Sequence, residues 1–173
     1  MVQRPPVLSR PVGHSSAARR LGNPAATGPC AERGRWLGGV NTQEHRLDTG
    51  GRRVLDVTEL VLAFCSSDGR DGLVNVFVPH ATAGVALMET GSGSEEDLQE
   101  LLERILPRDD RYRHRHGSIG HGGDHLLPVV VSPSVSIPVD GGRPLLGTWQ
   151  RVVVVDPNRE NDERLLRLTF VPA

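Results

Sequence analysis

Short apolar runs bounded by glycine, proline or aspartate dominate the chain, and they constrain its fold more than any other feature. Residues 73–78 and 151–155 are rich in β-branched side chains, which is typical of strands. The run at 73–78 is of the kind that is buried on both faces of a sheet. We expect about six or seven strands, drawn from residues 40–47, 52–57, 73–78, 85–88, 126–131, 134–139, 151–155 and 165–171.

Helical patterns are fewer and lie in the first two thirds of the chain. Thr58 is expected to cap a short helix over residues 59–66. A clearer helix follows, which Ser92 or Ser94 can cap and Pro107 ends. Its apolar stripe has helical spacing and consists of Leu98, Leu101, Leu102 and Ile105. Two helices and a succession of C-terminal strands predict an α+β fold, a sandwich or a strongly bent sheet.

Composition narrows the classes of function. The formal net charge of −1 gives no electrostatic case for nucleic acid as a partner. All 20 basic residues are arginine, which excludes a Schiff-base lysine and a Walker A lysine. Any bound phosphate must be held by arginine, backbone N–H groups or a metal. Cys30 and Cys65 are far apart, and Cys65 is expected to be a buried thiol rather than part of a disulfide.

The N-terminal segment differs from the rest. Residues 1–35 are rich in Pro, Gly, Ser, Ala and Arg and have no period, so we expect a disordered tail followed by one domain over residues 36–173. No stretch reaches the length of a membrane span, and the N-terminus lacks the apolar core of a signal peptide. The expected location is the cytoplasm, with no membrane partner.

A glycine-rich loop holds four of the seven histidines, which are His114, His116, His121 and His125. Three imidazoles and a water form a known catalytic zinc site, so the loop is a candidate metal site, with Asp124 as a further possible ligand. The neighbouring arginines, including Arg113, suit a phosphate or diphosphate. The alternative is a basic loop that faces water.

Further candidates lie elsewhere in the chain. His80 follows the strand predicted at 73–78, where loops commonly carry active sites. Taken alone, His80 fits a hydrogen-bonded structural histidine better, and it becomes a site candidate if the histidine loop lies close to it in space. Glu89 and Asp97 can each serve as a general base or orient an imidazole, and Asp97 also fits helix N-terminal electrostatics. Residues 148–150 lie between strands and can line a pocket or lock a turn.

Several motifs together resemble the YjbQ-like family, also known as secondary thiamine-phosphate synthases, from about residue 40 to the C-terminus. The first is Val-Phe-Val-Pro-His-Ala-Thr-Ala at residues 76–83, with Glu89 nine residues after His80. The second is Tyr112-Arg-His114, followed eleven residues later by His125-Leu126. The most specific pair is Ser-Val-Ser-Ile-Pro-Val at 134–139 with Leu-Gly-Thr-Trp-Gln at 146–150.

The resemblance implies a single-domain, β-sandwich-like α+β fold with two main helices, assembled as a homotrimer. It implies a divalent metal, Zn²⁺ or similar or Mg²⁺ with a diphosphate, on His80, His114 and His125, while His116 and His121 are additional to the family pattern. The implied catalytic residues are His80, Glu89, His114 and His125. The implied substrate- and anion-binding residues are Thr82, Arg113, Thr148, Trp149 and Gln150.

The activity that the resemblance implies is thiamine phosphate formation, in which a hydroxymethylpyrimidine diphosphate and a thiazole phosphate give thiamine phosphate and pyrophosphate. The small phosphorylated substrate would need its leaving diphosphate stabilised by arginine or a metal. Two alternatives remain open. One is a metal-dependent hydrolase of a phosphorylated or lactone substrate with Glu89 as base. The other is a trimer that binds a metal or anion without catalysis.

Overall fold

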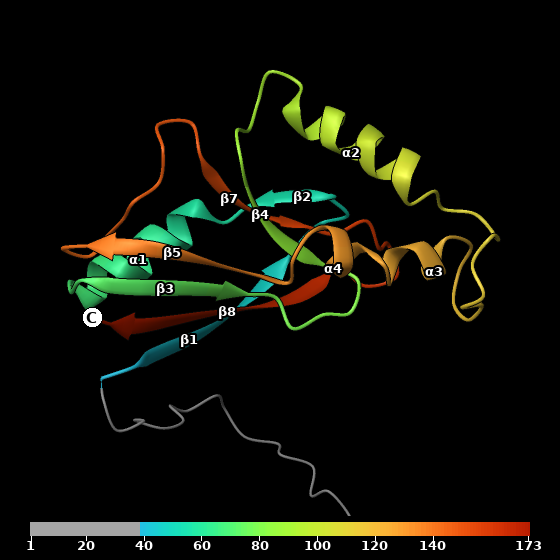
Figure 1. Cartoon of the computed structure of the whole chain (residues 1–173). Coiled ribbons are helices and arrows are strands. Elements are labelled where there is room, and N and C mark those ends of the chain that lie inside the picture. The colour runs from blue at the N-terminus through green and yellow to red at the C-terminus, as the bar shows by residue number, and fades with distance from the viewer. Residues whose placement is uncertain (1–38) are drawn as a thin grey trace, which may run out of the picture. The chain divides into compact units, whose positions relative to one another are not determined.

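The protein forms an α+β fold with two antiparallel sheets, described for residues 39–173 by a computed structural model (Figure 1). The tail expected at residues 1–35 lies outside the described residues. The elements are β1 (Asn41–Asp48), β2 (Val54–Asp56), α1 (Thr58–Asp68), β3 (Gly72–Phe77), β4 (Gly84–Met88), α2 (Ser94–Ile105), α3 (His121–Asp124), α4 (Leu127–Val130), β5 (Ser134–Asp140), β6 (Arg143–Pro144), β7 (Arg151–Val155) and β8 (Glu163–Pro172). The predicted fold class and the two main helices, α1 and α2, are confirmed. No helix among these residues is long and apolar enough to cross a membrane.

The strands do not pair in chain order. The larger sheet has the order β1-β8-β3-β5-β6, and the smaller sheet has the order β2-β7-β4. In the smaller sheet, Gly84 pairs with Val155 at one end and Met88 pairs with Arg151 at the other. This register decides which loops can meet, because the segment before β4 and the segment after β7 share one end of the sheet.

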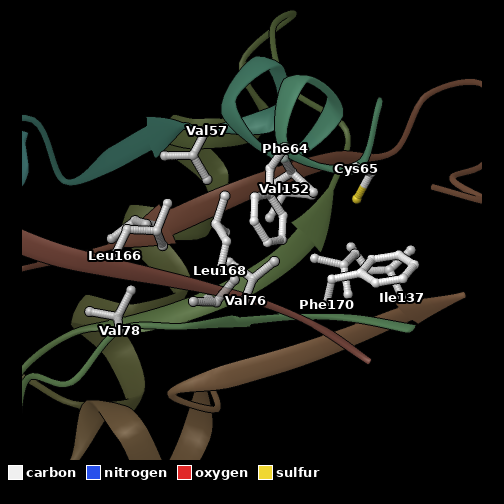
Figure 2. Packing of buried hydrophobic residues seen from close by; sticks show 14 of the residues in the cluster. Val57, Phe64, Cys65, Val76, Val78, Ile137, Val152, Leu166, Leu168 and Phe170 are labelled. Carbon is white, nitrogen blue, oxygen red and sulfur yellow. The ribbon is translucent and has the colours of Figure 1, made fainter. Parts of the chain in front are cut away.

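The main core lies between the larger sheet, α1 and one face of the smaller sheet (Figure 2). Val76, Leu168 and Phe170 project from the larger sheet, and Phe64 of α1 and Val152 of β7 belong to the same cluster. Each of these side chains is almost fully buried. Full burial of an aliphatic or aromatic side chain contributes roughly 1.5–3 kcal/mol, so the sandwich is held by this layer.

The other face of the smaller sheet is also covered. Val153 and Val155 of β7 pack with Leu102 of α2 and Leu127 of α4 in a second cluster. The central strand β7 is therefore buried on both faces, which explains its uninterrupted valines. The apolar stripe of α2 is only partly used, because Leu101 and Ile105 remain 52% and 47% exposed.

Two strand predictions need correction. The strand expected at 126–131 is the short helix α4, because Pro128 suits the first turn of a helix and the apolar run was too short to reveal a period. The strand at 73–78 is buried on one face only. Val74 and Val76 point into the core, whereas Leu73 is 46% exposed.

The expected helix caps are also replaced. Asp56 accepts hydrogen bonds from the backbone N–H and the hydroxyl of Thr58, at 2.8 and 2.5 Å, so Asp56 rather than Thr58 satisfies the start of α1. Gly93 occupies the cap position of α2, and the Glu95 carboxylate accepts the N–H of Gly91. The Glu95 bond fixes the turn before α2 and does not cap the helix, so neither Ser92 nor Ser94 acts as the predicted cap.

Candidate metal centre

The four histidines of the loop that follows α2 lie together in space. His114, His116, His121 and His125 each offer one ring nitrogen, and these nitrogens all lie within 4.8 Å of one another. The ring centroids of His114 and His116 are 4.1 Å apart, and those of His121 and His125 are 4.5 Å apart. His121 is buried and His125 half-buried, while the other two rings are exposed. We call this group the four-histidine cluster.

The inner pair of rings has an arrangement that favours a cation. Nε2 of His121 lies 2.8 Å from Nε2 of His125. A neutral imidazole has one N–H and one lone pair, so either a shared proton lies between these atoms or two lone pairs face each other. Burial, followed by the charges of the neighbouring histidines, lowers the pKa of His125, so this ring is neutral near pH 7 and has one lone pair. A metal ion would satisfy both nitrogens at once.

The spacing of the cluster suits zinc after small adjustments. Tetrahedral Zn²⁺ with nitrogen ligands at about 2.0–2.1 Å needs those nitrogens roughly 3.3 Å apart. That value falls between the 2.8 Å of the inner pair and the 4.8 Å limit of the whole group. His114 and His116 are exposed and can rotate towards the inner pair without disturbing the core.

Glycines allow the loop to fold back tightly on itself. Gly117 has a φ of +78°, in the region that favours glycine, and a Cβ there would lie 2.8 Å from Cγ of His121. At Gly122 a Cβ would come within 2.7 Å of the carbonyl oxygen of His114. The His121 ring is therefore packed against backbone at Gly117 that has no room for a methyl group, and the loop backbone is equally tight at Gly122.

A buried ion pair anchors the loop to the rest of the domain. The Asp124 side chain is 1% exposed and accepts a hydrogen bond from Nη1 of Arg108 at 2.5 Å. Asn158 donates to the other carboxylate oxygen at 3.2 Å, and Arg108 also donates to the carbonyl of Pro157. Burial raises the pKa of Asp124, and the Arg108 charge opposes that rise. Asp124 is occupied by these partners and does not belong to the cluster, so it serves as an anchor and not as a ligand.

A carboxylate from the connection between β7 and β8 lies against the cluster. Oε1 of Glu160 accepts the backbone N–H of Ser118 at 2.6 Å, and Oε2 lies 3.1 Å from Nδ1 of His121. The Ser118 hydrogen bond is the main reason that the pKa of Glu160 falls to about 2. The His121 contact is within ion-pair distance but lacks the alignment of a hydrogen bond, so buried Nδ1 has no hydrogen-bond partner among the described residues.

His80 does not belong to the four-histidine cluster but lines a hollow next to it. Its Nε2 accepts the backbone N–H of Leu165 at 2.8 Å. Burial, then the charge of Arg164, lowers its pKa, so the ring is neutral near pH 7. The hollow is also lined by His125, Phe77 and the prolines Pro79, Pro128 and Pro133. His80 and His125 thus share one surface, while the role of His80 as a metal ligand stays a prediction.

The remaining predicted residues are divided between two ends of the smaller sheet. Thr82 is half-buried in the turn after His80, and Arg113 is exposed within the histidine loop.

Glu89 follows β4 at the end of the sheet away from His80. Thr148, Trp149 and Gln150 are exposed beside that same far end, where Gln150 accepts the N–H of Gly147 at 2.8 Å. Within one chain, Glu89 and residues 148–150 therefore lie away from the histidines, and their roles stay predictions.

Asp97 is exposed in the first turn of α2, which agrees with a role in helix N-terminal electrostatics.

Sequence reasoning missed the residues that support the cluster from behind. Glu160 lies 42 residues from Ser118, and Asn158 lies 34 residues from Asp124. Both belong to a polar segment with no period or motif of its own. Asp156 and Asn158 are buried despite their polarity, but this burial is visible only in the fold and not in the sequence.

The fold and the histidine loop together define a class, namely small α+β proteins with an imidazole-rich site at one end of a two-sheet sandwich. The model of the UPF0047 protein YjbQ-like family matches residues 43–173. The chain therefore belongs to the YjbQ-like family. The UPF0047 protein of Mycobacterium tuberculosis is 64% identical over 132 residues, which are 76% of this chain and 98% of that protein. The UPF0047 protein of Archaeoglobus fulgidus is 32% identical and covers 65% of this chain and 87% of its own length.

Solved structures give the same result. A hypothetical protein of Aeropyrum pernix superposes with a TM-score of 0.70 at 34% identity and covers 77% of this chain and 99% of its own. A YbjQ-like protein of unknown function from Sulfolobus solfataricus has a TM-score of 0.72 at 21% identity and covers 78% of this chain and 98% of its own, which supports the fold alone.

Proposed function

We propose that this protein binds a divalent transition metal, with zinc as the best match, through the four-histidine cluster, and that the metal serves a transferase reaction on a small phosphorylated substrate. The observation that carries this proposal is the convergence of four ring nitrogens within 4.8 Å. Imidazole is a favoured ligand of zinc, and packing alone gives no reason to gather four such polar rings in one loop.

The surroundings of the cluster support a role in substrate binding. His125 belongs both to the cluster and to the wall of the hollow that contains His80 and Phe77. Flat apolar walls suit an aromatic or heterocyclic group, and the exposed guanidinium of Arg113 on the same loop suits a phosphate. A metal held here would supply a positive charge that stabilises a departing phosphate or diphosphate.

The transferase that fits these residues is of the thiamine-phosphate synthase type. The bond between the pyrimidine methylene carbon and the diphosphate oxygen breaks, the electron pair leaves with pyrophosphate, and the thiazole nitrogen forms the new bond to that carbon. In this proposal Arg113 binds the leaving group and the apolar hollow holds the ring. His80 stays neutral and fixed by Leu165, and orients the ring from the opposite wall.

One observation favours a second candidate, a metal-binding protein without catalysis. Structural zinc sites are closed by four protein ligands, whereas catalytic sites have three and an open position. Four histidines are available here. If all four bind, no position remains for substrate. A cobalt-substituted protein would separate the two cases, because a catalytic site changes its visible spectrum when pyrophosphate is added and a closed site does not.

We further propose that the chain assembles as a homotrimer. The two ends of the smaller sheet each carry exposed apolar side chains, with Val129 (82%) and Ile119 (70%) at the histidine end and Trp149 (71%) at the other. In this proposal the two different patches pair head to tail between copies, with a rotation that closes the assembly into a ring. Such a ring would place Trp149 and Glu89 of one copy beside the histidines of the next and would unite the predicted site.

Metal analysis of protein purified without a His tag tests the central proposal. We expect about one zinc per chain, in line with one four-ligand site, and loss of that zinc in His121→Ala and His125→Ala. Wild-type protein that holds no zinc after incubation with it would refute the metal site. Growth of a thiamine auxotroph tests the reaction, since well-expressed wild-type protein should restore growth and His125→Ala should not.

A further inference from the structure

We propose that Glu160 is a positioning residue of the metal centre, which accepts the Nδ1–H of His121 and so turns the Nε2 lone pair of that ring towards the metal. This inference rests on the proposed metal site and adds a residue from outside the histidine loop to it. A histidine that binds a metal through one nitrogen commonly donates its other N–H to a carboxylate or a carbonyl, which fixes the ring and its tautomer.

The two nitrogens of His121 meet different partners on opposite sides of the ring. Nδ1 lies 3.1 Å from Oε2 of Glu160, and Nε2 lies 2.8 Å from Nε2 of His125 within the cluster. The His121 side chain is 11% exposed and its Nδ1 is buried, so water cannot replace the carboxylate there. Glu160 therefore faces the side of the ring away from the proposed metal and acts through His121, not as a ligand.

Glu160 is itself held in place. Its other oxygen accepts the N–H of Ser118 at 2.6 Å, and its own backbone N–H donates to Oδ1 of Asn158 at 3.0 Å. Asn158 in turn binds Asp124, the residue before His125. The connection between β7 and β8 thus supports both inner histidines, one through Glu160 and one through Asp124.

The backbone of the loop is shaped for the same contact. A Cβ on Gly117 would lie 2.8 Å from Cγ of His121 and 3.1 Å from Oε1 of Glu160. Gly117 leaves open the space in which the carboxylate and the ring approach each other.

Glu160→Gln is the decisive variant because it has the same shape and the opposite hydrogen-bonding character. Its amide oxygen can still accept the Ser118 N–H, but its amide N–H₂ then faces Nδ1 of His121 as a donor. The ring is expected to adopt the Nε2–H tautomer, which has no lone pair for the metal. The matched control is Glu163→Gln, which removes the same charge from a nearby glutamate whose side chain is 78% exposed.

Two measurements separate this role from a structural one. In metal-free protein near pH 8, long-range ¹H–¹⁵N NMR should show His121 as the Nδ1–H tautomer in wild type and Glu163→Gln, and as Nε2–H in Glu160→Gln. Zinc affinity, measured by competition with a chromophoric chelator, should fall about 10- to 100-fold in Glu160→Gln. The melting temperature of the metal-free protein should change little.

The outcomes distinguish this inference from the metal site itself. If wild type binds zinc and Glu160→Gln binds it within twofold, Glu160 does not position His121. If wild type binds no zinc, the metal site fails, and the tautomer then decides alone, since an unchanged His121 tautomer in Glu160→Gln overturns the inference. Glu160→Ala guards against misfolding of the glutamine variant, and it should weaken zinc binding less than Glu160→Gln because it places no donor against Nδ1.

Discussion

The Nε2 atoms of His121 and His125 lie 2.8 Å apart, at the buried side of the four-histidine cluster. His121 begins α3 and His125 directly follows it, so the helical turn brings the two rings together. This pair is the fixed part of the cluster, and the exposed His114 and His116 are the adjustable part. A metal would bind to a site of which half is already in place.

The contribution of each histidine to zinc binding should follow this division. We expect His121→Ala and His125→Ala to remove stoichiometric zinc, and His116→Ala to weaken binding while retaining some metal. His80→Gln should keep its zinc, because the His80 ring serves the Leu165 N–H. Elemental analysis of the four variants checks the order. Loss of zinc in His80→Gln would instead support the ligand set implied by the family resemblance.

The stability of the protein should fall on mild acidification, in part because of His80. Its pKa is lowered from 6.5 in the folded state, so below about pH 6.5 the unfolded chain takes up a proton that the folded chain does not. The contribution of neutral His80 to stability is complete above about pH 6.5, the pKa of the unfolded chain. It is lost as the pH falls towards the lowered pKa of the folded state. The loss should stay well below the roughly 1.4 kcal/mol per pH unit of one full proton, because the half-buried ring is partly screened by water.

Urea unfolding at pH 7.5, 6.5 and 5.5, with a chelator present, measures this dependence. His80→Gln retains an acceptor for the Leu165 N–H but cannot titrate, so its free energy of unfolding should fall less steeply with acid than that of wild type. The cluster histidines affect both proteins alike and cancel in the difference. Equal slopes in the two proteins would show that His80 does not contribute.

The histidine cluster could be predicted from sequence, whereas its supporting residues could not. His114 to His125 are close along the chain, and the glycines between them permit a tight loop, so local reasoning was enough. Glu160 contacts that loop only because β7 and β8 return the chain to it, and nothing in the sequence around Glu160 marks this contact. The strands could be predicted where β-branched residues are dense, as in β7. The run at 126–131 forms the helix α4 and not the predicted strand, because one turn of apolar helix and a short strand have the same composition.

Loss of the Asp124 anchor should destabilise the loop and the domain together. Asp124→Asn keeps the shape but leaves the partly buried Arg108 guanidinium without its counter-charge. Breaking a buried pair in this way costs about 3 kcal/mol or more. The free energy of unfolding in urea checks the value, and Arg108→Gln should cost a comparable amount. In the double variant the two losses should not add, because each single change already breaks the same pair; full additivity would mean that the pair is not an anchor.

The exposed valines of α4 give the test of the proposed trimer. Val129 is 82% exposed, so Val129→Asp should not disturb the core of a single chain, yet it would place a charge in the proposed interface. We expect the wild-type mass by light scattering to equal three chains and that of Val129→Asp to approach one. Ala63→Asp, at an exposed position of α1, adds the same charge elsewhere and should remain a trimer. If Val129→Asp keeps the wild-type mass, α4 is not in the interface, and the head-to-tail ring that would unite Trp149 with the histidines does not form.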